Sequence, residues 1–482
     1  MCIILVLATS SCQKWLDVKP QNEQISDLYW SNKEEVEAVL GAAYVKLRGT
    51  VETMLAWGEV RGTTLAIGGY TTQDLVDLKS FRMQPTNGLT QWADFYAIIN
   101  YANMVLRYAP EVMDKDPSFN RATMESFLSE AYFLRGLSYF YLVRTFGDVP
   151  LILDPYMNDD QAYELAKSPK AEVFSQIVSD LTTALSSGKE VWPTIWETKG
   201  RSTKWAIHAL LADVHLWTGD YDDAIISCNA VLESGRYGLL QGMLNNKNNW
   251  FTIFGLGNTN EGIFEIQFDY TKDQTNGLVS MFGTNYRWIV SPYLVSLYEE
   301  NTEDIRGVGG TYQGEGDFQL WKYLGAEGNT TIPRPYSDQN WILYRMADIY
   351  LMKAEALIMK GEEWYPEAIS LISDIRIRAG VSRPLDVENT ELALLNAVLE
   401  ERSREFAGEG KSWFDLLRVA RRNDYAYKDY FIEQVLLGVG GASTPVIRSQ
   451  LMNVNSHYLP INEDELDNNK LLLQNPYYEI LN

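Results

Sequence analysis

The chain has 482 residues, of which 46% are apolar and 22% are charged, proportions that exclude a disordered, collagen-like or coiled-coil protein. Lysine and arginine number 41 and aspartate and glutamate 64, so the net charge of −23 repels phosphate backbones and anionic lipid headgroups. Nucleic acid is therefore not expected as a partner. The 14 Trp, 29 Tyr and 17 Phe residues suit both helix packing and stacking against sugars.

A short apolar run opens the sequence. Residues 2–8 (CIILVLA) are followed by three small residues and then Cys12, an order typical of a signal peptide that ends in a lipobox. We expect residues 1–11 to be removed and the Cys12 thiol to carry the lipid that anchors the protein to a membrane. The run is too short to cross a bilayer, and no other segment reaches the roughly 18 apolar residues that a spanning helix needs.

Amphipathic helix patterns recur along the chain. Three of them end at a glycine, namely Gly147, Gly219 and Gly361, and the last two are followed by a second amphipathic pattern. Around Gly219 the alanines and the tyrosine have the spacing of a tetratricopeptide unit. Further helix patterns at residues 90–113 and 170–185 supply packing partners. The sequence therefore predicts a mainly α protein built on tetratricopeptide-like helix pairs.

Two long segments interrupt this helical pattern. Residues 49–89 are rich in Gly, Thr and Gln and are predicted to form a loop. Residues 237–341 also lose helical periodicity, and within them only residues 262–268 alternate enough to predict a strand. This insert is rich in aromatic residues and has few predicted elements that could bury them. Long loops of this kind are often functional.

The rings in these irregular segments are the candidate ligand contacts. A sugar site needs flat rings for the apolar face of a pyranose and amide, carboxylate or guanidinium groups for its hydroxyls. Because irregular segments leave a ring free to face solvent, we expect both kinds of group there. The candidates are Trp57, Tyr70, Tyr270, Tyr286 and Trp288 for stacking, with Asp74, Arg82 and Asn276 for hydrogen bonding. Trp288 is the strongest single candidate.

Several blocks in a fixed order carry a family resemblance. They are Cys12 with Trp15-Leu16-Asp17 and Gly41-Ala42-Ala43-Tyr44, then Phe146-Gly147-Asp148-Val149-Pro150, Tyr344-Arg345-Met346-Ala347-Asp348, residues 401–418 (ERSREFAGEGKSWFDLLR), Leu459-Pro460-Ile461 and Gln474-Asn475-Pro476. Together these blocks, which span nearly the whole chain, resemble the SusD/RagB family of Bacteroidetes outer-membrane lipoproteins.

The resemblance implies four helix pairs and a division into an N-terminal SusD-like region (12–236) and a C-terminal RagB/SusD-like region (237–482) that contains the insert 237–341. It further implies a non-catalytic lipoprotein on the cell surface that binds oligosaccharides, needs no cofactor and passes its ligand to a SusC-like TonB-dependent outer-membrane transporter. The helical repeats would pack against the transporter, and ligand would bind on the opposite, loop-rich side.

The block at 401–418 also invites an enzymatic interpretation. Glu401, Glu405 and Glu409 follow one another at intervals of four, and a glycosidase needs a pair of carboxylates. Arginines are interleaved with them, however, so we predict a structural ion-pair network and assign no catalytic residue. His208 and His215 are seven residues apart, which is too far for a zinc pair, and no metal site is predicted.

Two alternatives remain open at this stage. A peptide-binding lipoprotein of the same architecture would use the same aromatic residues. A secreted glycoside hydrolase is less favoured, because the acidic residues of the 401–418 block lie in a basic neighbourhood that opposes the raised pKa of an acid catalyst.

Overall fold

The structure is a computed structural model that describes residues 29–157, 164–283, 286–314, 318–439 and 444–479. The predicted signal peptide (1–11) and the predicted lipidation site Cys12 lie outside these residues. Among the described residues, no helix combines the length and the apolar character needed to cross a bilayer.

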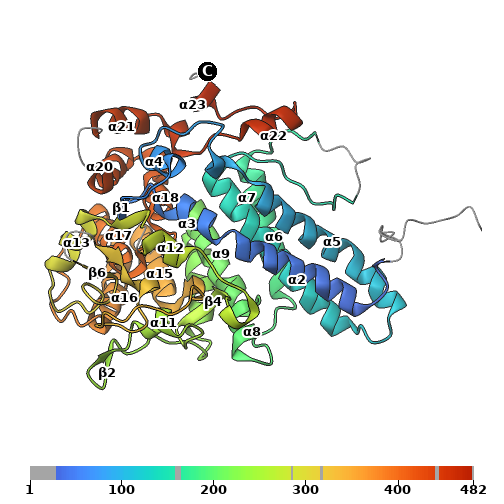
Figure 1. The fold of residues 1–482 in the computed structure, drawn as a ribbon, viewed down its shortest axis with the longest axis horizontal. Helices are drawn as coiled ribbons and strands as arrows, with labels where there is room; N and C mark the ends of the chain where they lie inside the picture. Colours follow the sequence, from blue (N-terminus) through green and yellow to red (C-terminus); the bar gives the residue numbers. More distant parts are fainter. Residues whose placement is uncertain (1–28, 158–163, 284–285, 315–317, 440–443, 480–482) are drawn as a thin grey trace, which may run out of the picture.

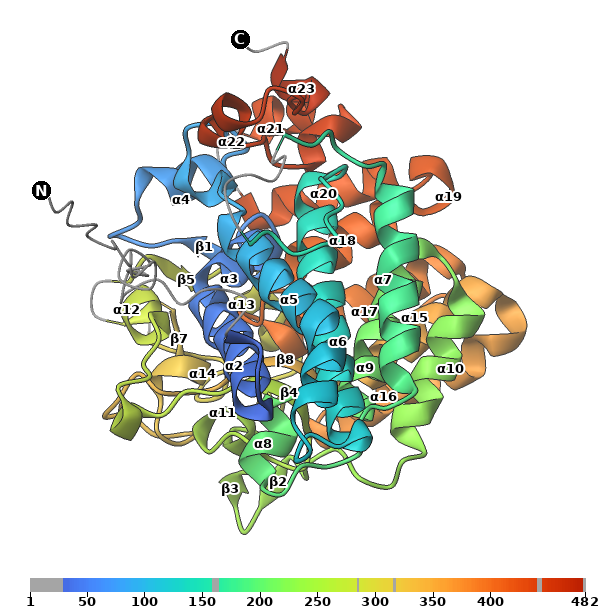
Figure 2. The same ribbon diagram turned by 90° about the vertical axis from the view of Figure 1, so that its right-hand side faces the viewer.

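Eight helices of the described chain form four consecutive pairs. The pairs are α2 (Lys33–Gly49) with α5 (Ala93–Lys115), α6 (Arg121–Phe146) with α7 (Lys170–Leu185), α9 (Lys204–Thr218) with α10 (Tyr221–Leu232), and α15 (Met346–Lys360) with α16 (Tyr365–Arg378). Each pair packs on the next, through α5 on α6, α7 on α9 and α10 on α15. The helices therefore form one continuous layer (Figures 1 and 2). The predicted mainly α fold with about four tetratricopeptide-like pairs is confirmed.

The ends of these helices follow from the local sequence. Asn32 begins α2 with a capping box, in which its side chain accepts from the Glu35 N–H and the Glu35 carboxylate accepts from the Asn32 N–H. Gly147, Gly219 and Gly361 end α6, α9 and α15 with φ of 79°, 91° and 117°, a region that favours glycine. The three glycines at which the sequence predicts helix ends therefore do end helices.

The segment 49–89 differs from the predicted long loop. It contains α3 (Val51–Glu59), β1 (Leu65–Ile67), α4 (Gln73–Lys79) and the start of η2 (Gly88–Thr90). Helix α3 is buried on nearly every side, so it lacks the amphipathic pattern that marks a surface helix. Gly58 does not break this helix. A Cβ there would overlap the Gly410 carbonyl, so the glycine permits a close approach of two backbones.

The insert consists of short paired strands and short helices. Strand β4 (Gly262–Ile266) pairs antiparallel with β8 (Trp341–Arg345), which confirms the predicted strand. The other elements are β2 (Met243–Leu244) with β3 (Lys247–Asn248), β5 (Trp288–Val290) with β1, β6 (Tyr312–Gln313) with β7 (Gln319–Leu320), α11 (Thr252–Gly255), η3 (Tyr270–Lys272), α12 (Leu278–Phe282), α13 (Pro292–Glu299) and α14 (Trp321–Leu324).

Most rings of the insert are buried, contrary to expectation. Trp250, Phe282 and Tyr323 are nearly inaccessible. Tyr323 stacks on Trp341 of β8, and its hydroxyl donates to the Gly408 carbonyl at 3.0 Å. The rings are thus covered by one another and by the 401–418 block, which is distant in the sequence.

The remaining helices close the fold around this shared core. They are α8 (Ile195–Gly200), η4 (Glu362–Trp364), α17 (Glu391–Phe406), α18 (Ser412–Ala420), α19 (Arg422–Tyr425), α20 (Lys428–Val439), α21 (Thr444–Leu451), η5 (Val454–His457), α22 (Glu463–Asn468) and α23 (Pro476–Glu479). In Figure 1 the layer of α2, α5, α6 and α7 lies at the right, the insert at the lower left and α20–α23 along the top. The division at residue 237 stays a prediction.

Candidate functional site

The candidate ligand site is a surface strip that runs from Tyr70 and Tyr286 to Tyr270 and Tyr336. It begins where the segments flanking β1 and β5 meet. Gly68 N–H donates to the Arg287 carbonyl (2.8 Å), and Tyr70 N–H donates to the Tyr286 carbonyl (3.2 Å). A Cβ on Gly68 would collide with the Tyr286 ring and backbone, so glycine is needed for this approach. These hydrogen bonds bring together two of the rings that were predicted to stack on a ligand. Tyr70 is 64% exposed, and Tyr286 is half-buried.

Charged groups continue the strip beside these tyrosines. Arg287 forms an ion pair with Glu52 of α3 at 3.7 Å, and both side chains are partly exposed. On the other side, α4 carries Asp74, whose carboxylate accepts from the Gly88 N–H at 3.2 Å. Arg82 is exposed and lies 3.6 Å from Asp77. Asp74 and Arg82 are both exposed and keep hydrogen-bonding capacity for solvent or ligand, and Asp74 is four residues from Tyr70 in the chain.

A Cβ on Gly277 would overlap the Glu52 carboxylate, so the segment that begins with η3 lies against α3 there. The same segment carries one of two stacked tyrosines, which we take as the other end of the strip. Tyr270 and Tyr336 stack with ring centroids 3.8 Å apart and planes 14° from parallel, and they are 45% and 46% exposed. Asn276 ties their two segments together, since its N–H donates to the Ser337 carbonyl (2.9 Å) and its amide to the Gln339 carbonyl (2.8 Å). Asn276 thus positions the tyrosines and has little capacity left for a ligand.

Tyr336 was missed by the sequence reasoning. It follows Pro333-Arg334-Pro335, a stretch in which two prolines prevent a helix or a central strand. A ring directly after such a stretch stands on a turn, and that is the signal that could have found it.

Two predicted stacking residues are not on the strip. Trp57 lies in α3, fully buried, where its indole N–H donates to the Leu89 carbonyl (2.8 Å) and its ring stacks on Phe95. Trp288 lies in β5, opposite Ile67 of β1, and is also fully buried. The expectation that these two rings lie in irregular segments and face solvent is wrong, because each ring lies on the core-facing side of a regular element.

The acidic residues of the 401–418 block form a buried ion cluster. The Glu405 carboxylate lies 2.8 Å from Arg306, 2.5 Å from Arg345 and 2.5 Å from Arg378. Burial alone would raise the pKa of Glu405, but the three guanidiniums outweigh it and hold the pKa well below its usual range. This carboxylate stays ionised, and the predicted structural network is confirmed.

The neighbouring carboxylates are held in the same way. Glu401 lies 2.6 Å from Arg306, and Glu409 lies 2.8 Å from Arg345 and 3.0 Å from Lys322. Burial opposes the ionisation of Glu409, but Arg345 and Lys322 lower its pKa nonetheless. An acid catalyst needs a raised pKa, so this arrangement does not suit glycoside cleavage. Among the described residues, no three His, Cys, Asp or Glu side chains gather as a metal site would require.

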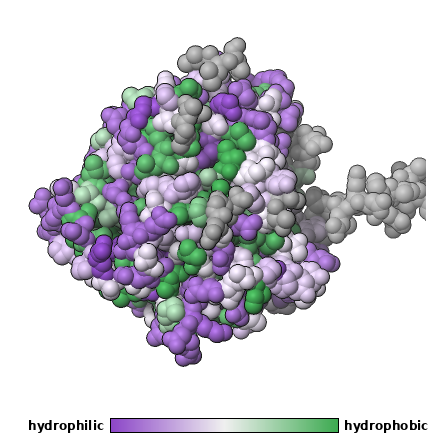
Figure 3. Space-filling view, turned by 60° about the vertical axis from the view of Figure 1, so that its left-hand side comes forward, coloured by the Kyte–Doolittle hydropathy of each residue, from purple (hydrophilic) through white to green (hydrophobic). Residues whose placement is uncertain are grey.

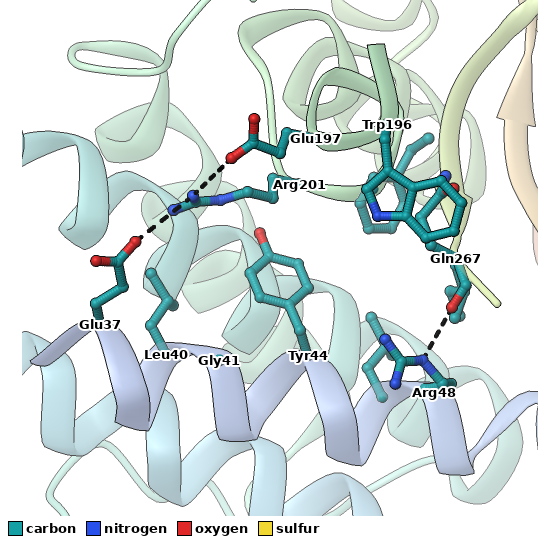
Figure 4. A pocket seen from close by; sticks show the side chains of 13 residues that line it. Glu37, Leu40, Gly41, Tyr44, Arg48, Trp196, Glu197, Arg201 and Gln267 are labelled. Carbon is teal, nitrogen blue, oxygen red and sulfur yellow. Dashed lines mark hydrogen bonds and ion pairs between the residues drawn. The ribbon is translucent and has the colours of Figure 1, made fainter. Parts of the chain in front are cut away.

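A pocket of about 260 Å³ opens between α2 and α8 (Figure 4). Arg201 lies at one rim, 3.9 Å from both Glu37 and Glu197, and at the other rim Arg48 donates to the Gln267 carbonyl. Gly41 lies on the floor, with no atom near the place its Cβ would occupy. The charged groups of this pocket therefore satisfy one another, and the open space is bounded by α2.

The face that carries α13 and β6 has hydrophilic and hydrophobic residues interspersed (Figure 3). Most folded proteins have a mixed surface of this kind, so this face does not by itself mark a ligand site.

Two family models match the chain. One, described as "SusD family", covers residues 310–478, and the other, described as "Starch-binding associating with outer membrane", covers residues 14–216. The chain belongs to the SusD/RagB family.

Known SusD/RagB-family proteins are similar over most of the chain. A SusD-like protein P38 from Formosa agariphila is 26% identical over 85% of this chain and 88% of its own length, and a SusD-like protein from Bacteroides ovatus is 22% identical over 89% and 85%. A SusD superfamily structure from Bacteroides fragilis has a TM-score of 0.77 at 21% identity, covering 93% of this chain and all of its own. A structure named a laminarin binding SusD-like protein has a TM-score of 0.71 at 24% identity, covering 92% and 99%.

Proposed function

We propose that this chain is a lipid-anchored protein of the outer-membrane surface that binds oligosaccharides and delivers them to a SusC-like TonB-dependent transporter. The observation that carries the proposal is the strip from Tyr70 and Tyr286 to Tyr270 and Tyr336, where accessible rings lie near the charged groups of Arg287 and Glu52. The family-model name that mentions starch and the outer membrane, and the laminarin-binding neighbour, support the same ligand class.

The chemistry of the strip suits a weak, extended site. A ring contributes only about 1 kcal/mol beyond its own burial, so a shallow surface needs several contacts. Tyr70 and Tyr286 offer aromatic faces at one end, and Asp74, Arg82 and the Arg287 guanidinium offer partners for hydroxyls. Affinity should therefore rise with the length of the oligosaccharide.

Binding without turnover is part of the proposal. The carboxylates of the 401–418 block are buried and paired with arginines, so they support a structural role and not acid catalysis. We also propose that Cys12 carries the lipid and that the helical layer faces the transporter. A Cys12→Ala variant should then be released from membranes of cells that lack the transporter, whereas its retention would contradict the anchor.

Calorimetry with starch-derived and laminarin-derived oligosaccharides tests the ligand class. The wild type should bind at least one of them, and Tyr70→Ala should weaken that binding about tenfold, or 1.4 kcal/mol, at an unchanged melting temperature. Ile226→Ala, at an exposed position of α10, is the matched control and should bind as the wild type does. Binding of a mixed peptide digest without binding of either glycan would favour the peptide-binding alternative.

A further inference from the structure

A second pocket, of about 390 Å³, lies between the first half of α5, the segment that follows α6, and helix α22. On α5, Ala93 and Ala97 lie one turn apart on the same face, and their short side chains leave the space open. Ile152 and Leu472 supply apolar walls. The volume lies within the range of small-molecule sites, about 300 to 1,000 Å³. None of the residues that line this pocket belongs to the strip, so the two sites are separate.

The amide side chains in the walls of this pocket are already used by the protein itself. The Asn100 amide donates to the Tyr156 carbonyl at 3.1 Å and accepts from the Tyr156 N–H at 2.7 Å. The Asn469 amide donates to the Leu165 carbonyl at 2.8 Å. These hydrogen bonds fix the shape of the pocket and leave it few polar groups for a ligand.

The exception is Glu465 of α22. Its side chain lines the pocket and is partly exposed, so a molecule in the pocket can reach the carboxylate. Burial raises the pKa of Glu465, although the Trp92 indole N–H donates to the carboxylate and opposes this shift. Among the described residues no lysine or arginine pairs with it, and residues 158–163 (NDDQAY) contain neither. The pocket therefore has one carboxylate without an opposite charge beside it.

This lining selects the charge and the polarity of the ligand. A carboxylate that has lost part of its hydration is stabilised most by a cation that donates a hydrogen bond to it. The net charge of −23 attracts cations and repels anions. A sugar fits poorly, because most of its hydroxyls would face Ala97, Ile152 and Leu472 and lose their water without compensation. The lining therefore favours an amine that has an apolar body.

We propose that this pocket binds such an amine, whose ammonium group donates to the Glu465 carboxylate while its apolar body lies over Ala93 and Ala97 and against the Tyr96 ring. The Tyr96 hydroxyl donates to the Pro150 carbonyl at 2.8 Å, which holds the ring at the side of the pocket. The site goes beyond the proposed function, since it needs no glycan. The same ammonium chemistry is offered by a free amine and by the lysine side chain of a protein.

The test titrates the full chain with three probes of similar shape and different charge, which are phenethylamine, 2-phenylethanol and 3-phenylpropionate. Ligand-observed NMR gives the dissociation constant of each. Phenethylamine should bind about tenfold more tightly than the alcohol, because only the ammonium forms an ion pair with Glu465. The carboxylate probe should bind more weakly than the alcohol, because Glu465 repels it.

Two variants separate the charge of the pocket from its space. Glu465→Gln keeps the size of the side chain and an oxygen that accepts from the Trp92 indole. It should lower the affinity for phenethylamine about tenfold, to that of the alcohol, and leave the affinity for the alcohol unchanged. Ala93→Leu, at an exposed position of α5, fills the pocket and should abolish binding of both. Glu463→Gln, on α22 but outside the pocket, is the matched control and should bind as the wild type does.

A fourth probe distinguishes the two sources of the amine. Nα-acetyl-lysine amide carries a lysine side chain and no free amino end. If it binds and Glu465→Gln weakens it, the pocket receives a lysine of a partner protein. If phenethylamine binds and this probe does not, the pocket receives a free amine.

Four results would overturn the proposal: equal affinity of the wild type for phenethylamine and 2-phenylethanol, a Glu465→Gln variant that still prefers the amine, binding that survives Ala93→Leu, or no binding of any probe. If Glu465→Gln does not fold, the wild type and Ala93→Leu still decide. Glu465→Gln should bind oligosaccharides as the wild type does, and Tyr70→Ala should bind phenethylamine as the wild type does. The amine site and the glycan strip can therefore fail separately.

Discussion

The ion cluster around Glu405 and the strip from Tyr70 to Tyr336 contain the same kinds of residue and use them in opposite ways. In the cluster, every carboxylate meets guanidiniums away from water, so the charges hold distant segments together. On the strip, charged groups and rings remain accessible, and their local contacts are few. A run of charges and aromatics in the sequence is therefore not by itself a binding site, since burial decides which role it has.

The largest effect should come from the centre of the ion cluster. Glu405→Ala leaves the three guanidiniums of Arg306, Arg345 and Arg378 buried without their shared carboxylate. Breaking a buried pair in this way costs about 3–5 kcal/mol, so denaturant unfolding should show a loss at the top of that range. Glu400→Ala, on the same helix but partly exposed and 3.6 Å from Arg404, should cost less than about 1 kcal/mol. Equal losses for the two variants would contradict the buried network.

Trp288 and Tyr286 offer a test within one short segment. Trp288→Ala removes a fully buried ring from β5 and should lower the free energy of unfolding by about 3–5 kcal/mol. Tyr286→Ala, at the half-buried position of the strip, should instead reduce glycan affinity with a much smaller loss of stability. A Trp288→Ala variant that kept its stability and lost glycan binding would instead show that Trp288 contacts the ligand.

Acid should remove the stabilisation that two buried carboxylates provide. Burial opposes ionisation of Asp348 and Glu355, but Lys411 and Arg402 lower the pKa of Asp348 to about 2, and Arg418 with Arg422 lower that of Glu355 to about 2. Since both values lie below those of the unfolded chain, the stabilisation is complete above about pH 4.5 and is lost as the pH falls toward 2. Above pH 4.5 each ionised carboxylate contributes about 3 kcal/mol to the free energy of unfolding. Melting temperatures measured from pH 6 to 2.5 should therefore fall steeply below pH 4.5. A flat profile would contradict these shifts.

The smallest effect should come from Gly41, on the floor of the pocket in Figure 4. Gly41→Ala adds a methyl group where no atom lies within 4 Å and replaces glycine in the middle of α2, so it should stabilise the protein by about 0.5–1 kcal/mol. Gly58→Ala is the contrasting variant, because its methyl group would overlap the Gly410 carbonyl beside the ion cluster. It should destabilise the protein in the same thermal melt, and a stable Gly58→Ala would show that the two backbones can separate.

The helical layer could be predicted because its signals are local. Amphipathic periodicity located α7 at Lys170–Leu185, and glycines marked the ends of α6, α9 and α15. The order of the pairs follows once neighbours along the chain pack together. The first pair, α2 with α5, is interrupted by α3, β1 and α4. Helix α3 was not predicted, because a helix buried nearly all round has no polar face to reveal its period.

The site could be predicted only in part. Tyr70, Asp74, Arg82 and Tyr270 are exposed as expected, because they lie on turns, on a short surface helix or next to one. Trp288 could not be placed, since its burial depends on β1, which pairs with β5 from a distant part of the chain. Short strands of this kind carry too few residues to show their pairing in the sequence.

The cluster around Glu405 also dictates an order of folding. Arg306, Arg345 and Arg378 reach Glu405 from three separate segments, all of which are synthesised before α17. The α2, α5, α6, α7, α9 and α10 helices contact one another at short sequence separation and can close early. The three arginines have Asp304 and Glu261 as earlier partners, but they lack the carboxylate that they share until residue 405 is synthesised. The cluster is therefore completed late, when α17 brings Glu405 to the three arginines.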